Sequence, residues 1–251
     1  FEKRGSAQCK STVMLAALNS SGETVIKAKK SRDHTENFFK YLGIPIVIKK
    51  NKTIDEIRVR GQKVFKSFKY KVPSDPSSCA FFIVLTLLSK NCELKIKNVN
   101  INQSRIGYIK LLNKMGAKIK IKNVKKLYGE KQADILVKSQ PNLKNITCPP
   151  SLSSNLIDEF LIIFLAAAKA NGVSSFSNLA ELNKKESPRL KLGSKLLNQL
   201  GIKTKLTKDT IKIFGNPHSI AKKTINVKKY YKDHRIFMTS VIAAYTFNSK
   251  F

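Results

Sequence analysis

The sequence predicts an α/β protein assembled from repeated βαβαββ-like units. Apolar helical runs alternate with strand-like segments along the 251 residues. Glycines follow three predicted helices, at Gly43, Gly116 and Gly201, where a helix end commonly needs a left-handed residue. These glycines are 73 and 85 residues apart, far more than in solenoid repeats, so each interval corresponds to a whole supersecondary unit.

The first predicted unit covers residues 6–50 and alternates helix with strand. In order, we expect a helix at 12–18 ended by Gly22, a strand at 23–28, a helix that opens at 31–36 and ends at Gly43, and a strand at 44–48. The pattern then recurs along the rest of the chain. We expect helices at 75–88, 106–115, 158–172 and 186–200, strands at 93–99, 117–121 and 173–178, and a last helix that opens at Asp233.

Polar residues stand at the starts of the predicted helices. The expected N-caps are Ser6, Ser31, Asp75, Ser187 and Asp233, with Pro76 and Pro188 at positions that accept proline. A helix start presents free N–H groups and the positive end of the helix dipole, which together attract anions. Several such starts directed at one place suit a substrate with phosphate and carboxylate groups, although any single one can be an ordinary cap.

The chain is strongly basic, with a formal net charge of +32. Lysines supply most of this charge and are spread over nearly every segment, which is typical of a compositional bias and a solvated surface. Arginine is rarer, so each arginine is a candidate for the bidentate grip on phosphate or carboxylate that lysine cannot make. The arginines are Arg4, Arg32, Arg58, Arg60, Arg105, Arg189 and Arg235.

The cysteines and apolar runs exclude several protein classes. Cys9, Cys79, Cys92 and Cys148 form no CxxC pair, which favours reduced thiols in a cytoplasmic protein over a disulfide or zinc framework. The longest apolar runs, 79–88 and 160–168, are too short to cross a bilayer. The chain begins at Phe1, without Met and directly at a motif, and it ends at Phe251, just past an apolar segment, so we expect a chain that is incomplete at both ends.

Six short motifs occur in a fixed order along the chain. They are Gly5-Ser6-Ala7-Gln8-Cys9-Lys10-Ser11, Ser31-Arg32-Asp33-His34-Thr35-Glu36, Asp75-Pro76-Ser77-Ser78, Ile157-Asp158-Glu159-Phe160, Lys185-Glu186-Ser187-Pro188-Arg189-Leu190 and Asp233-His234-Arg235. Their order and spacing resemble the 5-enolpyruvylshikimate-3-phosphate (EPSP) synthase family, over nearly the whole chain. The resemblance implies an inside-out α/β barrel fold of βαβαββ units, in two domains with a cleft between them.

The resemblance also implies domains and an activity. Residues 1–73 would be the C-terminal part of the first domain, and residues 74–251 a second domain truncated at its C-terminus. Members of the family transfer the enolpyruvyl group of phosphoenolpyruvate to the 5-hydroxyl of shikimate 3-phosphate. The family works without a metal or organic cofactor, so we expect none, and we expect a cytoplasmic monomer with no membrane or specific nucleic-acid partner. We expect the fragment alone to be inactive.

The site residues follow from the same resemblance, position by position. The implied ligands of shikimate 3-phosphate are Ser6, Ala7, Gln8, Arg32, Asp158 and Lys185. The implied ligands of phosphoenolpyruvate are Gln8, Arg189 and Arg235. Asp158 would accept the proton of the 5-hydroxyl, and Glu186 would handle the proton at the phosphoenolpyruvate methylene group.

Other residues in the motifs receive structural interpretations. We expect His34 and His234 to support loop geometry, Arg105 to belong to a turn, and Lys10 to be either a solvated lysine or an added charge. The sequence departs from the family pattern where Pro188 replaces an aspartate and Phe237 replaces a small residue. Pro188 should preserve the helix start as its first residue.

Two alternatives remain open at this point. The sibling enzyme UDP-N-acetylglucosamine enolpyruvyl transferase shares the fold and the donor, but lacks the Ser-Ala-Gln, Arg-Asp-His-Thr-Glu and Lys-Glu-Ser pattern. A basic nucleic-acid-binding protein is suggested by the charge alone. That class predicts basic clusters interleaved with aromatic residues, which the sequence does not display.

Overall fold

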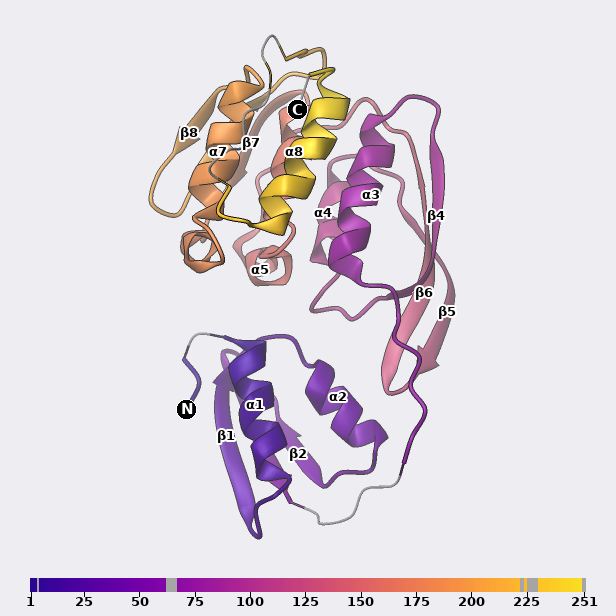
Figure 1. Cartoon of the computed structure of the whole chain (residues 1–251), viewed down its shortest axis with the longest axis vertical. Helices are drawn as coiled ribbons and strands as arrows, with labels where there is room; N and C mark the ends of the chain where they lie inside the picture. Colours follow the sequence, from indigo (N-terminus) through magenta and orange to yellow (C-terminus); the bar gives the residue numbers. More distant parts are fainter. Residues whose placement is uncertain (4, 62–66, 222–223, 225–229, 250–251) are drawn as a thin grey trace. The chain divides into compact units, whose positions relative to one another are not determined.

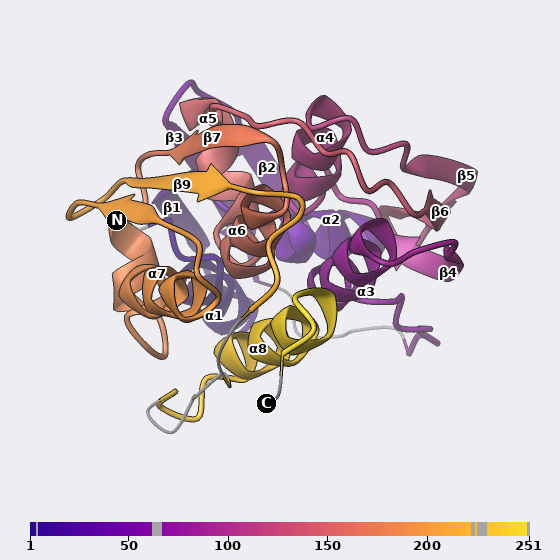
Figure 2. The ribbon, with the colours of Figure 1, turned by 90° about the horizontal axis from the view of Figure 1, so that it is seen from above.

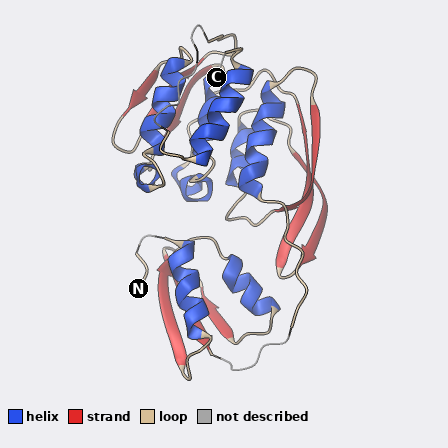
Figure 3. Cartoon of the chain, viewed as in Figure 1, coloured by secondary structure: helices blue, strands red, loops and turns tan. Residues whose placement is uncertain are grey.

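The computed structural model describes residues 1–3, 5–61, 67–221, 224 and 230–249, so that Arg4 lies outside the described residues. Helices and strands alternate along the chain (Figures 1 and 3). The chain divides into two compact units, each of which is described by itself. Unit 1 comprises Phe1–Pro73, Asn100–Ser104 and Val124–Gln132, and unit 2 comprises Ser74–Val99, Arg105–Asn123 and Ala133–Phe251.

The elements have the following bounds. The helices are α1 (Ala7–Ala17), α2 (His34–Tyr41), α3 (Pro76–Leu88), α4 (Gly107–Lys114), α5 (Pro150–Ser153), α6 (Phe160–Ala168), α7 (Arg189–Gln199) and α8 (His234–Thr246), with 3-10 turns η1 (Ser154–Leu156) and η2 (Ala180–Lys184). The strands are β1 (Glu23–Lys29), β2 (Ile46–Lys49), β3 (Ile54–Arg60), β4 (Glu93–Asn100), β5 (Lys120–Leu127), β6 (Glu130–Lys138), β7 (Gly172–Phe176), β8 (Thr204–Leu206) and β9 (Ile211–Gly215).

The same arrangement of strands occurs three times among the described residues. The sheets have the orders β1-β3-β2, β4-β6-β5 and β7-β9-β8. In each sheet, the strand that comes last in the sequence lies between the other two. In the first sheet β3 runs antiparallel to both neighbours, and in the third sheet β9 does the same. This repetition confirms the α/β class and the repeated units that the sequence predicted.

Several predicted elements need correction. The first helix begins at Ala7 instead of residue 12, and the strand predicted at 117–121 lies at Lys120–Leu127. The strands β3, β6, β8 and β9 had no counterpart in the prediction. Gly43, Gly116 and Gly201 have φ values of +72°, +97° and +78°, which confirms the left-handed residue after each helix.

The predicted helix caps are right in three cases and wrong in two. Ser6, Asp75 and Asp233 accept main-chain N–H groups of their own helices. The residue that caps α2 is Asp33, not Ser31, and it makes no side-chain cap bond. The cap of α7 is Pro188, so proline precedes the helix and does not form its first residue, while Ser187 turns its hydroxyl elsewhere.

The core of unit 1 lies between its helices and its sheet. The inward-facing residues of β1 alternate with exposed ones, and those of β3 with partly buried ones, as expected for a sheet covered on one face. Met14 from α1 and Phe39 from α2 are buried against Ile26, Ile57 and Val59 of these strands.

The core of unit 2 is built around α6, in which every residue is buried. Helices α3, α7 and α8 contact α6, and Figure 2 shows α6 between these helices and the β7–β9 sheet. A helix that is apolar on all sides needs such surroundings. No helix in the described part of the chain has both the length and the apolar character to span a membrane. The starts of α6, α7 and α8 carry the polar residues described next.

Candidate active site

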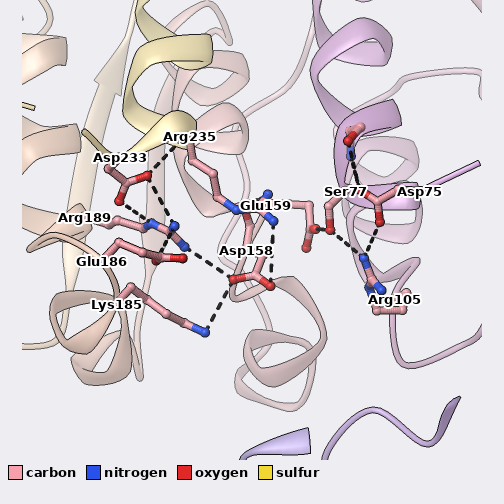
Figure 4. A network of polar contacts seen from close by, with 11 residues as sticks. Asp75, Ser77, Arg105, Asp158, Glu159, Lys185, Glu186, Arg189, Asp233 and Arg235 are labelled. Carbon is pink, nitrogen blue, oxygen red and sulfur yellow. Dashed lines mark hydrogen bonds and ion pairs between the residues drawn. The ribbon is translucent and has the colours of Figure 1, made fainter. Parts of the chain in front are cut away.

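Three basic residues of unit 2 lie around the carboxylate of Asp158. Asp158 lies in the turn that precedes α6. Lys185 Nζ lies 3.5 Å and Arg189 Nη1 3.4 Å from Asp158 Oδ1. Arg235 Nη2 lies 4.0 Å from Asp158 Oδ2, and Arg235 Nη1 donates to the main-chain oxygen of Asp158 at 3.0 Å. Figure 4 shows these side chains pointing toward one another from three separate segments.

Arg189 is anchored by Asp233 and almost completely buried. Its Nε donates to Asp233 Oδ2 at 2.9 Å and its Nη2 to Asp233 Oδ1 at 3.3 Å, which is the forked geometry that arginine makes with a carboxylate. Ser187 also donates to Asp233 Oδ2, at 2.7 Å. Burial of Asp233 favours its neutral form, but the hydrogen bonds from Arg189 and Ser187 outweigh burial, and the pKa of Asp233 lies below its ordinary value.

Glu186 is the accessible carboxylate of this group. Its Oε2 accepts from Arg189 Nη2 at 2.5 Å, yet its side chain is 57% exposed, compared with 11% for Asp158. The cluster therefore combines one exposed carboxylate, Glu186, with the shielded carboxylates of Asp158 and Asp233 around one buried guanidinium group. That is an arrangement with two separate places at which a proton could be taken or given.

Glu159, next to Asp158, is a buried residue to which the sequence interpretation gave no role in the site. Ser77 donates to its Oε1 at 2.5 Å, and Arg105 Nη2 donates to Ser77 at 2.9 Å and to Asp75 at 2.7 Å. Burial raises the pKa of Glu159 above its ordinary value, although Ser77 acts in the opposite direction. The sequence signal for this burial was its place at the start of a wholly apolar helix.

The first motif forms a helix start in unit 1. Ser6 Oγ accepts from the main-chain N–H of Cys9 at 3.2 Å, and Gln8 is exposed in the first turn of α1. Glu2 Oε2 accepts from the main-chain N–H groups of Gly5 at 2.7 Å and Ser6 at 3.1 Å. The main chain at this helix start thus already holds one carboxylate, as expected of an anion-binding turn.

His34 belongs to a polar cluster centred on Glu130, also in unit 1. Its Nδ1 lies 2.7 Å from Glu130 Oε1, and Asn37 and Asn102 donate to the same oxygen at 3.2 Å and 3.0 Å. Asn100 donates to the other carboxylate oxygen. Burial works against the charge of Glu130, but these hydrogen bonds, with the largest from His34, lower its pKa to about 2.

The structure groups the predicted site residues by unit. Asp158, Lys185, Glu186, Arg189 and Arg235 come together in unit 2. Ser6, Ala7, Gln8 and Arg32 belong to unit 1. Over the described ranges, no group of three or more His, Cys, Asp or Glu side chains is placed to hold a metal ion.

Comparison with known proteins identifies the family. The profile of the EPSP synthase family (3-phosphoshikimate 1-carboxyvinyltransferase) matches residues 2–250. The chain belongs to the EPSP synthase family. Curated relatives named 3-phosphoshikimate 1-carboxyvinyltransferase occur in Ruthia magnifica and Petrotoga mobilis, and each is 41% identical over 240 residues. They cover 95% of this chain, whereas the chain covers 53% and 54% of them. The chain therefore spans about half the length of its EPSP synthase relatives.

Solved structures agree with this family. An EPSP synthase from Acinetobacter baumannii superposes with a TM-score of 0.82 at 35% identity, over 95% of this chain and 54% of that one. The enolpyruvyl transferase NikO from Streptomyces tendae superposes with a TM-score of 0.65 at 15% identity, which shows a shared fold alone. These matches favour EPSP synthase over the sibling enzyme that the sequence interpretation kept as an alternative.

Proposed function

We propose that this chain takes part in transfer of the carboxyvinyl group of phosphoenolpyruvate to the 5-hydroxyl of shikimate 3-phosphate, with release of phosphate. The observation that carries the proposal is the convergence of Lys185, Arg189 and Arg235 on Asp158. Both substrates are polyanions, and the reaction needs a proton acceptor, a proton donor and concentrated positive charge. The cluster contains each of these.

Asp158 is proposed to accept the proton of the attacking hydroxyl. The oxygen of that hydroxyl forms a bond to C2 of phosphoenolpyruvate while C3 gains a proton, which gives a tetrahedral adduct. Loss of the C3 proton and of phosphate then forms the enol ether. Glu186 is proposed to exchange the C3 proton, because it is the more exposed carboxylate beside Arg189.

Arg189 and Arg235 are proposed to hold phosphoenolpyruvate. Arg235 keeps its side chain 14% exposed and makes only a 4.0 Å contact with the carboxylate of Asp158. Arg189 is more fully engaged, so an incoming carboxylate would replace Glu186, the exposed one of its three carboxylate partners. That exchange would release Glu186 for its role in proton transfer.

Shikimate 3-phosphate is proposed to contact Ser6, Ala7, Gln8 and Arg32 of unit 1 and Asp158 and Lys185 of unit 2. The helix start at Ser6 supports this, because its main-chain N–H groups already bind the carboxylate of Glu2. We propose further that the fold is the inside-out barrel of the family, with a first domain in residues 1–73 and a second in 74–251. The unit boundary between Pro73 and Ser74 supports this division, whereas Asn100–Ser104 and Val124–Gln132 depart from it because they belong to unit 1. A monomeric state and a cytoplasmic location belong to the same proposal.

The proposal is tested by steady-state kinetics on the full-length gene product, which includes any sequence beyond residues 1–251. We expect phosphate release that requires both substrates, and none with UDP-N-acetylglucosamine as acceptor. Asp158→Asn should lower turnover roughly 100- to 10,000-fold with shikimate 3-phosphate binding largely kept. Near-normal turnover in that variant would remove Asp158 from the mechanism.

The arginines give a second, substrate-resolved test. Arg235→Lys keeps the charge but loses the forked geometry, so KM for phosphoenolpyruvate should rise roughly ten- to a hundred-fold. Arg32→Lys should instead raise KM for shikimate 3-phosphate. The matched control is Arg58→Lys, since Arg58 pairs with Glu56 and Glu23 on the surface of β3. Equal weakening of both substrates in both variants would contradict the assignment of each arginine to its own substrate.

A further inference from the structure

Lys10 is a buried lysine in the first turn of α1. Its side chain is 4% exposed, although the sequence allowed a solvated lysine at this position. Its Nζ donates to the main-chain oxygen of Arg32 at 2.8 Å and lies 2.5 Å from Glu36 Oε1. Lys10 thus follows Ser6 and Gln8 on one helix and contacts the segment that carries Arg32.

A buried ion pair adds little net stability to a fold, so this placement calls for a reason beyond packing. A cation in the first turn faces the positive end of the helix dipole, and burial removes its hydration. Glu36 offsets the charge with one oxygen only. In the described part of the chain, neither its Oε2 nor the buried hydroxyl of Ser31 has a hydrogen-bond partner. A buried ion pair that is incompletely satisfied is weak support for a fold.

The contacts of Lys10 join the starts of two helices. Figure 1 shows α1 and α2 side by side with their starts at the same end of unit 1. Ser11 Oγ and Thr35 Oγ1 form a second link between these helices at 2.6 Å. The hydrogen bond of Lys10 differs from that link because its acceptor is the main-chain oxygen of Arg32. It therefore fixes the backbone from which the Arg32 side chain extends, relative to Ser6 and Gln8.

We propose that Lys10 is a positioning residue for shikimate 3-phosphate: its ammonium group fixes the Arg32 backbone against the Ser6–Gln8 helix start, so that the groups from both segments bind one anion together. The inference rests on the proposed function and deepens it. Lys10 acts through Arg32 and is not itself a ligand. Its effect should therefore appear in the binding of one substrate and not of the other.

The test compares three variants of the full gene product by steady-state kinetics with each substrate varied. Lys10→Met alone leaves the Glu36 carboxylate buried without its partner and can fail to fold. The decisive variant is therefore the double substitution Lys10→Met with Glu36→Leu, which removes both charges and restores packing. Lys40→Met, at an exposed lysine of α2, is the matched loss of one positive charge.

The double variant should fold with a melting temperature near that of the unsubstituted protein. Its KM for shikimate 3-phosphate should rise at least tenfold, while its KM for phosphoenolpyruvate changes less than twofold and Lys40→Met changes neither. Normal binding of shikimate 3-phosphate by the folded double variant would overturn the inference and leave Lys10 a structural residue. Absence of turnover in the unsubstituted gene product would instead overturn the proposed function.

Discussion

Arg189 is the side chain on which the polar cluster of unit 2 depends. Its guanidinium group is held in a fork by Asp233 and also contacts Glu186 and Asp158. The rarity of arginine in a lysine-rich chain predicted a forked grip on phosphate or carboxylate, and Arg189 makes such a fork with the internal carboxylate of Asp233. A single sequence identifies the geometry that a residue is suited to make, whereas the partner depends on packing between α7 and α8.

Asp233→Asn should destabilise the chain strongly. Asp233 is completely buried and carries the charge that faces Arg189, so its loss leaves a buried cation with weaker partners. We expect a loss of about 3 kcal/mol in the free energy of unfolding, measured by urea denaturation followed by circular dichroism. Glu186→Gln is the control, because that carboxylate is 57% exposed, and it should cost less than about 1 kcal/mol. Equal losses would show that burial does not distinguish the two pairs.

Glu159 gives a prediction for the pH dependence of stability. Its folded-state pKa lies above the ordinary 4.5 because of burial, so the folded state holds the proton more tightly than the unfolded state. Its contribution is therefore complete below pH 4.5 and is lost as pH rises through the folded-state pKa. Glu159→Gln keeps a neutral side chain, so the fall in the urea midpoint above pH 4.5 should be shallower in this variant. An unchanged slope would mean that Glu159 is ionised in the folded protein.

The pKa of Glu130 is shifted in the opposite direction to that of Glu159. Its folded-state pKa is about 2, below the ordinary 4.5, so its contribution is present above pH 4.5 and is lost as pH falls toward 2. Glu130→Gln should therefore flatten the acid side of the stability profile. The pair of variants separates two buried carboxyl groups that a single measurement of stability would merge.

At the scale of elements, the turn between β5 and β6 is a part of unit 1 whose contacts with α2 were not predicted from the sequence. Tyr128 packs edge-on against Tyr41 of α2 with ring centroids 5.7 Å apart, and Glu130 contacts His34 at the start of the same helix. Gly129 lies between them with φ of +80°, and a Cβ there would come within 2.6 Å of the main-chain oxygen of Asn37. Because Gly129 has no side chain, the turn can pack closely against α2.

Gly129→Ala should loosen this turn. The left-handed backbone and the close approach to α2 both oppose a side chain, and we expect a loss of about 2 kcal/mol or more in the free energy of unfolding. Gly22→Ala is the control, because no atom lies within 4 Å of a Cβ at that position. It should change stability by less than about 0.5 kcal/mol. Equal effects in the two variants would contradict the fitted contact.

The sequence predicted helices better than strands, for physical reasons. Caps, apolar faces and terminal glycines mark a helix locally, and α3 and α7 were placed within a few residues. Strand β5 is rich in lysine and nearly all of it is exposed, so it shows no alternation of buried and exposed residues. The central position of β3, β6 and β9 follows from pairing between distant segments, which periodicity does not encode.

At the scale of the whole molecule, the motifs predicted the family that the comparisons show, whereas the composition left a nucleic-acid-binding protein open as an alternative. The net charge of +32 comes mostly from lysines spread along the chain, whereas Lys185 and Arg189 converge on the single carboxylate of Asp158. The sequence left open whether Lys10 is solvated, because its burial depends on contacts with Arg32 and Glu36 from another segment. Motifs locate polar residues, and the fold decides which of them are shielded.

The net charge supports one last prediction, on nucleic acid. A basic surface attracts phosphates by releasing counterions, so the protein should bind duplex DNA of any sequence at low salt. Neutralising six to ten phosphates would make the affinity fall roughly 1,000-fold or more between about 50 and 200 mM salt. Fluorescence anisotropy with two duplexes of unrelated sequence measures both properties, and shikimate 3-phosphate serves as the competitor that discriminates a shared site from a diffuse surface. We expect equal affinities, the steep salt dependence and no competition at physiological salt. A tight, sequence-selective complex that survives at about 150 mM salt would mean that the lysines form a dedicated nucleic-acid surface in addition to the polar cluster around Asp158.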